Sequence, residues 1–282
     1  VVSKTDYIFH LAAAVGVFNI VNKPIASMVT NIQGTENILK LALKYRLPVF
    51  LTSSSEVYGK NTSDSLKETD DRVIGSPSIL RWSYSEAKAI DESLAYAYYV
   101  EKRLETRIVR FFNTVGPRQS GKYGMVIPRF VRAAIENKPL QIFGDGSQTR
   151  VFCHVNDSVK AILALATNDK TIGEVFNIGG RGEISILELA KLIIRQTNSK
   201  SEITFTDYED AYATGFEEMA RRVPDISKIK SELNWIPKVS IEEGVKLVLQ
   251  NIEYWRNAPV WTPDTIANET EDSVTFHASR VI

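Results

Sequence analysis

The chain has 282 residues, 44% of them hydrophobic and 24% charged, a composition typical of a globular protein with a sizeable core. Lysine and arginine together number 34, as do aspartate and glutamate, so no overall charge favours nucleic acid or an anionic membrane surface, and we expect neither as a partner. The single cysteine, Cys153, excludes an intrachain disulfide and fits a reducing compartment, and no apolar run is long enough to span a bilayer, so we expect a cytoplasmic protein.

Short apolar runs alternate with amphipathic segments through the first part of the chain. Such runs are typical of strands buried on both faces of a parallel sheet, and the amphipathic segments have apolar residues at helical spacing. The polar residues 60–80 predict a loop. Alternation of strand and helix predicts a parallel α/β sheet. The predicted strands are residues 6–11, 49–51 and 106–112, and the predicted helices are residues 24–45 and 84–100.

Shorter elements follow Gly116 and Pro117. Ser185 and Ser240 each precede a glutamate by one helical turn, which is the capping-box pattern of a helix start. Residues 256–282 lack periodicity, and we expect a loose tail there. The other predicted elements are a helix at 125–137, a strand at 140–143, a turn at 144–146, a helix capped by Asn156 that ends at Ala166, and a strand at 174–178.

Tyr84, Lys88 and Ser54 form a candidate set for removing a proton from an alcohol. A phenol is a poor base at neutral pH because its reference pKa is about 10. Lys88 lies four residues beyond Tyr84 on the same helix face, and its positive charge is expected to lower the pKa of Tyr84. Ser54, at a strand end, can bind the same substrate oxygen. The pair alone is a weak signal, and a surface pair plus a core tyrosine is the alternative.

Further segments of the sequence accompany the Tyr84 and Lys88 pair. Together with that pair, they make the chain resemble the extended short-chain dehydrogenase/reductase family. The resemblance is to its NAD-dependent nucleotide-sugar epimerases, dehydratases and decarboxylases, and it covers about residues 6–255. It implies an α/β fold with a Rossmann-like parallel sheet flanked by helices and a smaller C-terminal α/β substrate-binding domain. The segments that carry it, besides Tyr84 and Lys88, are residues 10–13, 53–59, 110–118, 143–150 and 221–225.

The resemblance also implies a domain organisation. Residues 1–178 are expected to form the NAD-binding domain, with a substrate-domain insertion at about 117–150, and residues 179–255 the substrate-binding part before the tail. Family members place further strands and a Gly-x-x-Gly-x-x-Gly turn before the strand at 6–11, and no such glycine spacing opens this chain. The sequence therefore predicts an N-terminal truncation, with the first strands of the sheet and the turn that binds the cofactor pyrophosphate missing.

The same resemblance assigns roles to individual residues. Tyr84 is the general base, Lys88 its electrostatic partner, and Ser54 bridges Tyr84 and the 4-oxygen of the sugar. His10 is a strand-end residue that shapes the cofactor crevice rather than a catalyst. No His, Cys or carboxylate cluster has metal-ligand spacing. The residues assigned to NAD are His10, Leu11, Ala12, Ala13, Asn31, Tyr84 and Lys88, and those assigned to the UDP-sugar are Ser55, Asn113, Val126, Phe143, Arg150 and Arg222.

Ser55 and Glu56 distinguish branches of the family. The 4,6-dehydratases carry Asp-Glu at this place, and eliminating water requires a general acid, for which serine is poor. Ser55-Glu56 resembles the UDP-glucuronate decarboxylases, as do residues 146–150 and 221–225, and some 4-epimerases share these segments. Glu56 is assigned to catalysis, and a salt-bridged residue beside the site is the alternative.

The activity predicted first is that of a UDP-glucose-type 4-epimerase acting through a transient 4-keto sugar. A UDP-glucuronate decarboxylase is the first alternative, because the same intermediate with a 6-carboxylate is a β-keto acid. A non-catalytic fragment that binds nucleotide sugars is the second, because the glycine motif is absent. The resemblance also implies a homodimer, formed through the helix around residues 31–44 and the helix that carries Tyr84.

Overall fold

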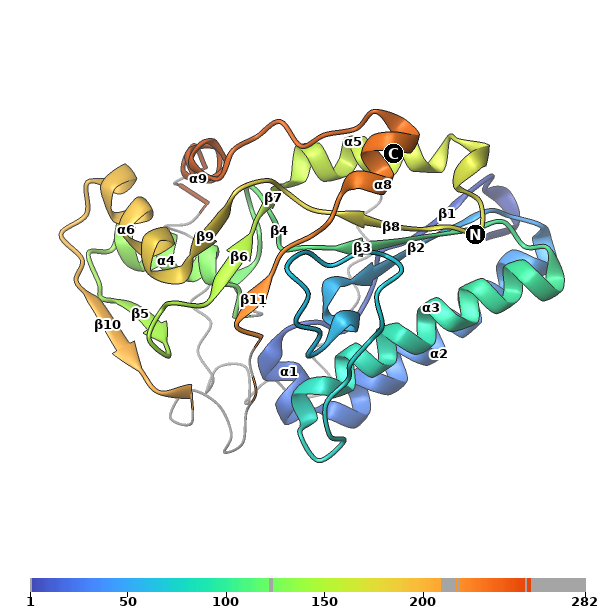
Figure 1. Ribbon diagram of the computed structural model, residues 1–282, viewed down its shortest axis with the longest axis horizontal. Helices are drawn as coiled ribbons and strands as arrows, with labels where there is room; N and C mark the ends of the chain where they lie inside the picture. Colours follow the sequence, from blue (N-terminus) through green and yellow to red (C-terminus); the bar gives the residue numbers. More distant parts are fainter. Residues whose placement is uncertain (1, 122–123, 209–216, 218, 252, 255–282) are drawn as a thin grey trace.

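A four-stranded parallel sheet forms the centre of the first part of the molecule, with strand order β1-β2-β3-β8 (Figure 1). The structure is a computed structural model that describes residues 2–121, 124–208, 217, 219–251 and 253–254. All three strand pairings are parallel, as the alternation of elements predicted. The strands are β1 (Ile8–His10), β2 (Val49–Ser54), β3 (Thr106–Phe111) and β8 (Val175–Ile178).

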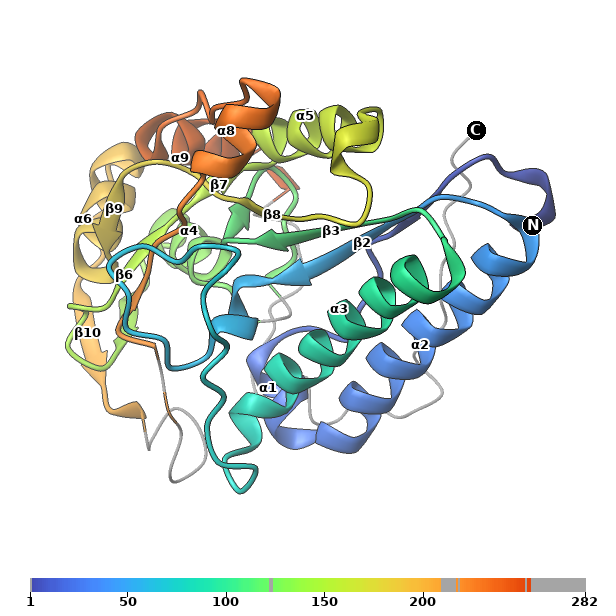
Figure 2. The same cartoon turned by 45° about the vertical axis from the view of Figure 1, so that its right-hand side comes forward.

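Helices cover both faces of this sheet, α2 (Pro24–Tyr45) and α3 (Ser83–Lys102) one face and α5 (Val155–Ala166) and α8 (Ser227–Leu233) the other (Figures 1 and 2). Alternate residues of the strands therefore enter different clusters. In β2, Val49 and Leu51 pack with Leu39 and Ala95 of α2 and α3, while Phe50 packs with the α5 side. Burial on both faces explains why these strands are continuous apolar runs in the sequence.

The second part of the molecule consists of short strands with three helices packed against them. Strand β6 lies between β11 and β9, β10 pairs with β5, and β4 pairs with β7. Phe130, Leu140, Leu189 and Val245 belong to the core of this part. The strands are β4 (Thr114–Val115), β5 (Leu140–Phe143), β6 (Thr149–Val151), β7 (Cys153–His154), β9 (Glu183–Ser185), β10 (Ile203–Thr206) and β11 (Arg221–Arg222), and the helices are α4 (Val126–Ile135), α6 (Ile186–Thr197) and α9 (Ile241–Leu249).

Short helical turns connect these elements. None of the helices in the described ranges is long and apolar enough to span a membrane. The short elements are α1 (Val17–Asn22) and the 3-10 turns η1 (Val2–Lys4), η2 (Ser55–Tyr58), η3 (Leu80–Trp82) and η5 (Asp169–Thr171).

Helix capping follows the sequence in two places and departs from it in one. The Ser185 hydroxyl accepts a hydrogen bond from the Glu188 amide at 3.1 Å, and Ser240 caps α9 in the same way, so both helices begin at the predicted serine caps. The prediction that Asn156 caps α5 is wrong. The helix begins at Val155 directly after β7, and Nδ1 of His154 accepts the hydrogen bond from the Asn156 amide.

The first and last predicted segments differ from the others. Strand β1 is shorter than the predicted residues 6–11, and within the described residues it pairs only with β2. Phe9 and Leu11 at this edge are 42% and 52% exposed. The predicted tail, residues 256–282, lies outside the described residues.

Candidate active site

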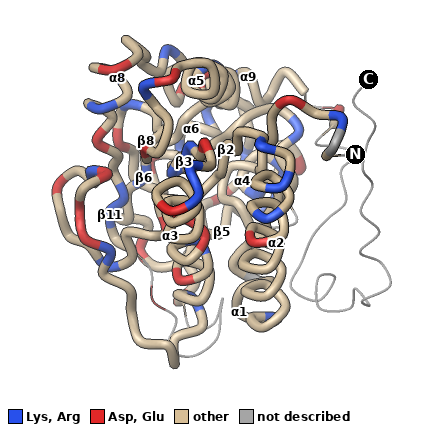
Figure 3. Tube along the Cα trace, turned by 90° about the vertical axis from the view of Figure 1, so that its right-hand side faces the viewer, with Lys and Arg blue, Asp and Glu red and all other residues tan. Residues whose placement is uncertain are grey.

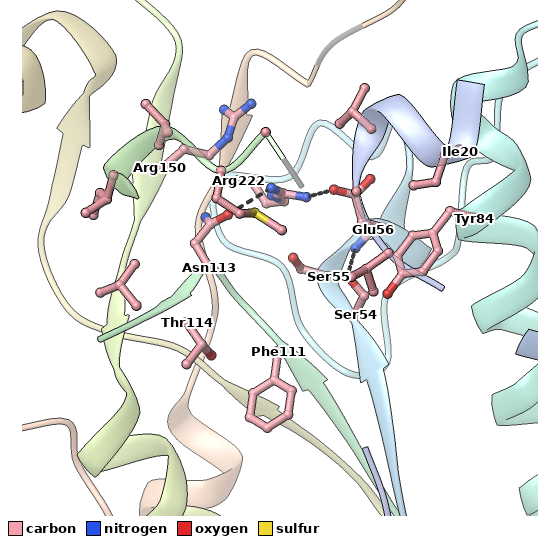
Figure 4. A pocket seen from close by; sticks show the side chains of 18 of the residues that line it. Ile20, Ser54, Ser55, Glu56, Tyr84, Phe111, Asn113, Thr114, Arg150 and Arg222 are labelled. Carbon is pink, nitrogen blue, oxygen red and sulfur yellow. Dashed lines mark hydrogen bonds and ion pairs between the residues drawn. The ribbon is translucent and has the colours of Figure 1, made fainter. Parts of the chain in front are cut away.

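A cavity of about 500 Å³ lies at the carboxyl ends of β2 and β3, where the sheet meets the second part of the molecule (Figure 4). Ligands of open parallel α/β sheets bind at this end of the strands. Most of the residues that the sequence assigned to a site line this cavity, and His10, Ala12 and Asn31 do not. The lining residues among those assigned are Leu11, Ala13, Ser54, Ser55, Glu56, Tyr84, Lys88, Asn113, Val126, Phe143, Arg150 and Arg222.

Tyr84 and Ser54 meet at the cavity floor, Tyr84 from the first turn of α3 and Ser54 from the last position of β2 (Figure 4). Burial raises the pKa of Tyr84, and the Ser54 hydroxyl, which interacts with the Tyr84 phenol, lowers it. The nearby carboxylates Glu56 and Asp91 also raise this pKa. The predicted lowering of this pKa by Lys88 is therefore not what the structure gives.

Besides burial, local compensation of the Lys88 charge contributes to this difference. The side chain is only 2% exposed. Nζ donates a hydrogen bond to the carbonyl of Thr52 at 3.0 Å and another to Oδ2 of Asp91 at 3.2 Å. A buried carboxylate thus offsets the ammonium charge that was expected to favour the phenolate.

Glu56 is held between two arginines. Arg222 from β11 donates to Oε1 (Figure 4). Arg81 from η3 approaches Oε2 at 2.5 Å. Burial by itself would raise the pKa of this carboxyl, but the two guanidiniums hold it well below its ordinary value. Glu56 is therefore a fixed carboxylate at neutral pH, as in the salt-bridged alternative, and cannot donate a proton as a general acid.

The arginine side of the cavity continues beyond this pair. Nη2 of Arg222 donates to Oδ1 of Asn113 at 3.0 Å, and Nδ2 of Asn113 donates to the Val151 carbonyl at 3.2 Å. The β11–β6 pairing places Arg222 opposite Arg150, whose Nη1 donates to the Thr149 carbonyl at 2.7 Å. Arg150 and Arg222 thus place two cationic groups on one wall, and Glu56 is the anionic partner of Arg222.

An aromatic corner closes the far end of the cavity. The guanidinium of Arg129 lies 3.9 Å from the centre of the Phe143 ring. Nε2 of Gln148 donates to the Phe143 carbonyl and to the hydroxyl of Tyr208, each at 2.9 Å. Val126 lines the cavity at the start of α4. A planar group stacked on an arginine suits recognition of another planar ring.

Asn31 and His10 lie behind the cavity rather than in it. Oδ1 of Asn31 accepts a hydrogen bond from the Ala14 amide at 2.7 Å, and its Nδ2 donates to the Ala14 carbonyl, so it holds the segment that places Ala13. Nε2 of His10 lies 3.3 Å from the Thr35 hydroxyl. Burial and the positive charge of Lys88 lower the pKa of His10 to about 4.

Sequence reasoning missed Arg81, Asp91 and Thr52. The sequence could have indicated Arg81, because it lies one helical turn before Tyr84 among mostly apolar residues that precede α3. Asp91 had a similar one, as an acid three residues beyond Lys88 on the same helix. Thr52 contributes only a backbone carbonyl, for which no side-chain pattern exists. Across the described residues, no cluster of His, Cys, Asp and Glu could hold a metal ion.

Comparison with known proteins identifies the family to which this site belongs. Residues 1–248 match the family model described as GDP-mannose 4,6 dehydratase. The chain belongs to this family. The predicted membership of the NAD-dependent nucleotide-sugar epimerases and dehydratases, and the predicted Rossmann-like fold class, are thereby confirmed.

Individual members of the family differ in activity. A UDP-N-acetyl-alpha-D-glucosaminuronate decarboxylase of Bacillus cytotoxicus is 44% identical over 88% of this chain and 77% of its own length. UDP-glucuronic acid decarboxylase 1 of Arabidopsis thaliana is 38% identical over 86% of this chain, which spans only 54% of that protein. The structure of UDP-glucuronic acid 4-epimerase from Bacillus cereus, in complex with UDP-glucuronic acid and NAD, has a TM-score of 0.79 and 30% identity over 89% of this chain and 78% of its own.

Proposed function

We propose that the protein is a NAD-dependent decarboxylase of a UDP-hexuronic acid. Of the activities predicted from sequence, this is the first alternative rather than the 4-epimerase. The decarboxylases of Bacillus cytotoxicus and Arabidopsis thaliana support it through their identity with this chain. The substrate class is UDP-glucuronate or its 2-acetamido counterpart.

The ionised Glu56 between Arg81 and Arg222 is the observation that carries this proposal. A dehydratase requires a general acid for the leaving hydroxyl, and a carboxyl with a strongly depressed pKa does not supply one at neutral pH. Two guanidiniums and one carboxylate give this cluster a net positive charge, and guanidinium groups suit a carboxylate ligand. The site therefore favours an anionic sugar over a neutral one.

Tyr84 and Ser54 act on the 4-hydroxyl of the sugar in this scheme. Ser54 orients the hydroxyl, and the Tyr84 oxygen takes its proton as C4 becomes a ketone. The C6 carboxylate is then β to that ketone, so the C5–C6 bond breaks, carbon dioxide leaves, and the electron pair passes to C5 and the 4-oxygen as an enolate. A proton added at C5 completes the step. Arg222 stabilises the negative charge on the 4-oxygen side.

The residues present fit the nicotinamide end of NAD. Tyr84 and Lys88 lie on one wall of the cavity and Leu11 and Ala13 on the β1 side, and the small Ala13 side chain leaves room for a flat ring. These residues would hold the nicotinamide and its ribose. When bound, NAD supplies the hydride acceptor for C4 and returns the hydride later, so the reaction has no net redox change.

A 4-epimerase remains the second candidate. The Bacillus cereus 4-epimerase structure favours it, because that enzyme also acts on a UDP-uronic acid and is similar over most of the chain. Tyr84, Ser54 and Lys88 serve both reactions equally, since both pass through a 4-ketone. A non-catalytic protein that binds nucleotide sugars is the third candidate, and NAD co-purifying with the protein would argue against it.

The test is incubation of the purified protein with NAD and, separately, UDP-glucuronate, its 2-acetamido counterpart and UDP-glucose. Carbon dioxide release and proton NMR of the nucleotide-sugar product are measured together. Carbon dioxide with a product that has lost C6 supports the decarboxylase. A UDP-galacturonate or UDP-galactose product without carbon dioxide supports the epimerase and overturns the proposal. The matched variant Arg222→Lys keeps the charge but loses the two-pronged geometry, and we expect its rate to fall roughly tenfold or more.

A further inference from the structure

A buried row of polar side chains runs from Tyr84 away from the cavity. Lys88 on α3 contacts Asp91 one turn further along the same helix, with Nζ 3.2 Å from Oδ2. The Thr35 hydroxyl of α2 faces the Asp91 carboxyl and also lies 3.3 Å from Nε2 of His10. Lys88, Asp91 and Thr35 are 2%, 0% and 1% exposed. The row therefore joins the helix of the candidate base to its neighbour α2 and to β1.

Stability does not explain this row. A buried ion pair usually adds little stability relative to apolar residues of the same size, because both charges lose their hydration. Oδ1 of Asp91 also has no hydrogen-bond partner within the described part of the chain, which is a further cost for a buried polar atom. Burial raises the pKa of Asp91, although Lys88 and Thr35 oppose this rise. A costly group that faces a site residue points to a role in that site.

The charged groups around Asp91 divide into two separate pairs. Glu92, the next residue, is occupied by Arg110 of β3 through two hydrogen bonds at 2.9 and 2.8 Å. Asp91 is thus the carboxylate that compensates Lys88. The remaining titratable or charged groups that face this region are Tyr84 on α3, His10 on β1, Glu56 on η2 and Arg222 on β11.

We propose that Asp91 is a positioning residue for the reaction, which fixes Lys88 beneath Tyr84 and, through Lys88, sets how readily the Tyr84 hydroxyl gives up its proton. The inference rests on the proposed role of Tyr84 as the base. Its physical basis is charge compensation: Asp91 cancels the ammonium charge and contributes its own negative charge near the phenol. Without Asp91, Lys88 would be an uncompensated cation close to Tyr84, and such a cation favours the phenolate.

The test is a direct titration of Tyr84 that does not require turnover. Tyrosinate absorbance at about pH 10, the reference pKa of tyrosine, is compared between each protein and the same protein carrying Tyr84→Phe. Followed over a titration that continues above this pH, we expect the Tyr84 tyrosinate signal of Asp91→Asn to appear roughly one pH unit below that of the parent. With the substrate that is turned over, the acid limb of the kcat/KM profile moves down by the same amount.

Two further variants separate charge from geometry. Asp91→Glu keeps the charge, so we expect the parent titration, but its extra methylene displaces Lys88 and lowers kcat roughly tenfold with KM little changed. Glu101→Gln removes a charge at the exposed end of α3 and is expected to change neither measurement. If Asp91→Asn does not fold, Asp91→Glu still decides the positioning role.

The proposal is overturned if Asp91→Asn folds and its Tyr84 titration matches the parent, or if Asp91→Glu has the parent kcat. A protein that turns over none of the nucleotide sugars contradicts the proposed function but leaves the absorbance measurement intact. A loss of melting temperature with an unchanged titration shows that Asp91 is merely structural.

Discussion

The Glu56 carboxylate accepts a hydrogen bond from the Arg222 guanidinium, which ties the end of β2 to strand β11 across the cavity. The two residues come from opposite parts of the chain, and Arg81 completes the cluster from the turn before α3. Because this cluster is both a structural connection and the charged wall of the candidate site, changes to it are expected to affect stability and binding together.

Glu56→Gln is expected to destabilise the fold in a pH-dependent way. Arg81 and Arg222 hold the pKa of Glu56 well below its ordinary value against the opposing effect of burial. Such a carboxyl stabilises the fold above its unfolded pKa of about 4.3, and this stabilisation is lost as the pH falls through the folded pKa. We expect a loss of about 3–5 kcal/mol at neutral pH, since breaking a buried pair leaves uncompensated charge.

Urea unfolding measures this effect, at neutral pH and again in steps below the ordinary carboxyl pKa. The difference in free energy of unfolding between Glu56→Gln and the parent should become smaller as the pH falls. Glu183→Gln is the matched control, because Glu183 pairs with Arg221, the neighbour of Arg222, at an exposed position. Glu183→Gln should lower the free energy of unfolding by at most about 1 kcal/mol. Equal effects of the two variants, or a difference that does not change with pH, would contradict the prediction.

Tyr84→Phe is expected to abolish most turnover and leave the fold intact. The substitution keeps the ring and removes only the hydroxyl that faces Ser54. Loss of a positioned acid or base typically costs roughly 10²–10⁴-fold in rate. The control is Tyr58→Phe, whose buried hydroxyl donates to Oδ1 of Asn177 at 2.8 Å outside the cavity. That variant should lose about 1–3 kcal/mol of stability but keep its rate, and steady-state kinetics of both variants distinguishes the roles.

The sequence predicted best what depends on neighbouring residues. The parallel sheet and the caps at Ser185 and Ser240 follow from local apolar spacing and local hydrogen bonds, and the structure has them. The cap of α5 was misassigned because Asn156 is the usual capping type, whereas the end of β7 places His154 there instead. The position where β7 ends, which the sheet determines, therefore decided the N-cap of α5 more strongly than the capping preference of asparagine did.

The sequence predicted most of the residues that line the site, but not the ion pairs that they form. Tyr84 and Ser54 were expected to meet, and they do. The arginine partners of Glu56 were not foreseen, because they depend on how closely η3 and β11 approach the end of the sheet. The direction of the Tyr84 pKa shift was predicted wrongly chiefly because burial raises this pKa, which the spacing of Tyr84 and Lys88 does not reveal, and the carboxylates of Glu56 and Asp91 raise it further.

Ser185→Ala is expected to weaken α6. The Ser185 hydroxyl satisfies the Glu188 amide, one of the unpaired donors at the helix start. Its loss should cost about 1 kcal/mol in chemical denaturation. Ser231→Ala is the control, because the exposed Ser231 hydroxyl only donates back to the Lys228 carbonyl within α8 and caps no helix. A Ser231→Ala cost as large as that of Ser185→Ala would contradict the capping argument.

We also expect a homodimer formed through α2 and α3, as the family resemblance implies. The two helices lie side by side on one flank of the molecule, with acidic and basic residues both scattered along them (Figure 3). Between the charges they expose apolar side chains that no described residue covers, including Ile25 at 79%, Val29 at 51% and Tyr96 at 53% exposure. Burying such a surface against a second copy would remove apolar area from water.

Light scattering at micromolar concentration should therefore give a dimeric mass for the parent, and Tyr96→Lys should lower it towards the monomer by placing a charge in the interface. Leu163→Lys is the matched control, since Leu163 is 55% exposed on α5, on the opposite face of the sheet. It should remain dimeric, because its lysine would stay in water. A monomeric parent, or dissociation by Leu163→Lys as well, would show that α2 and α3 do not form the interface.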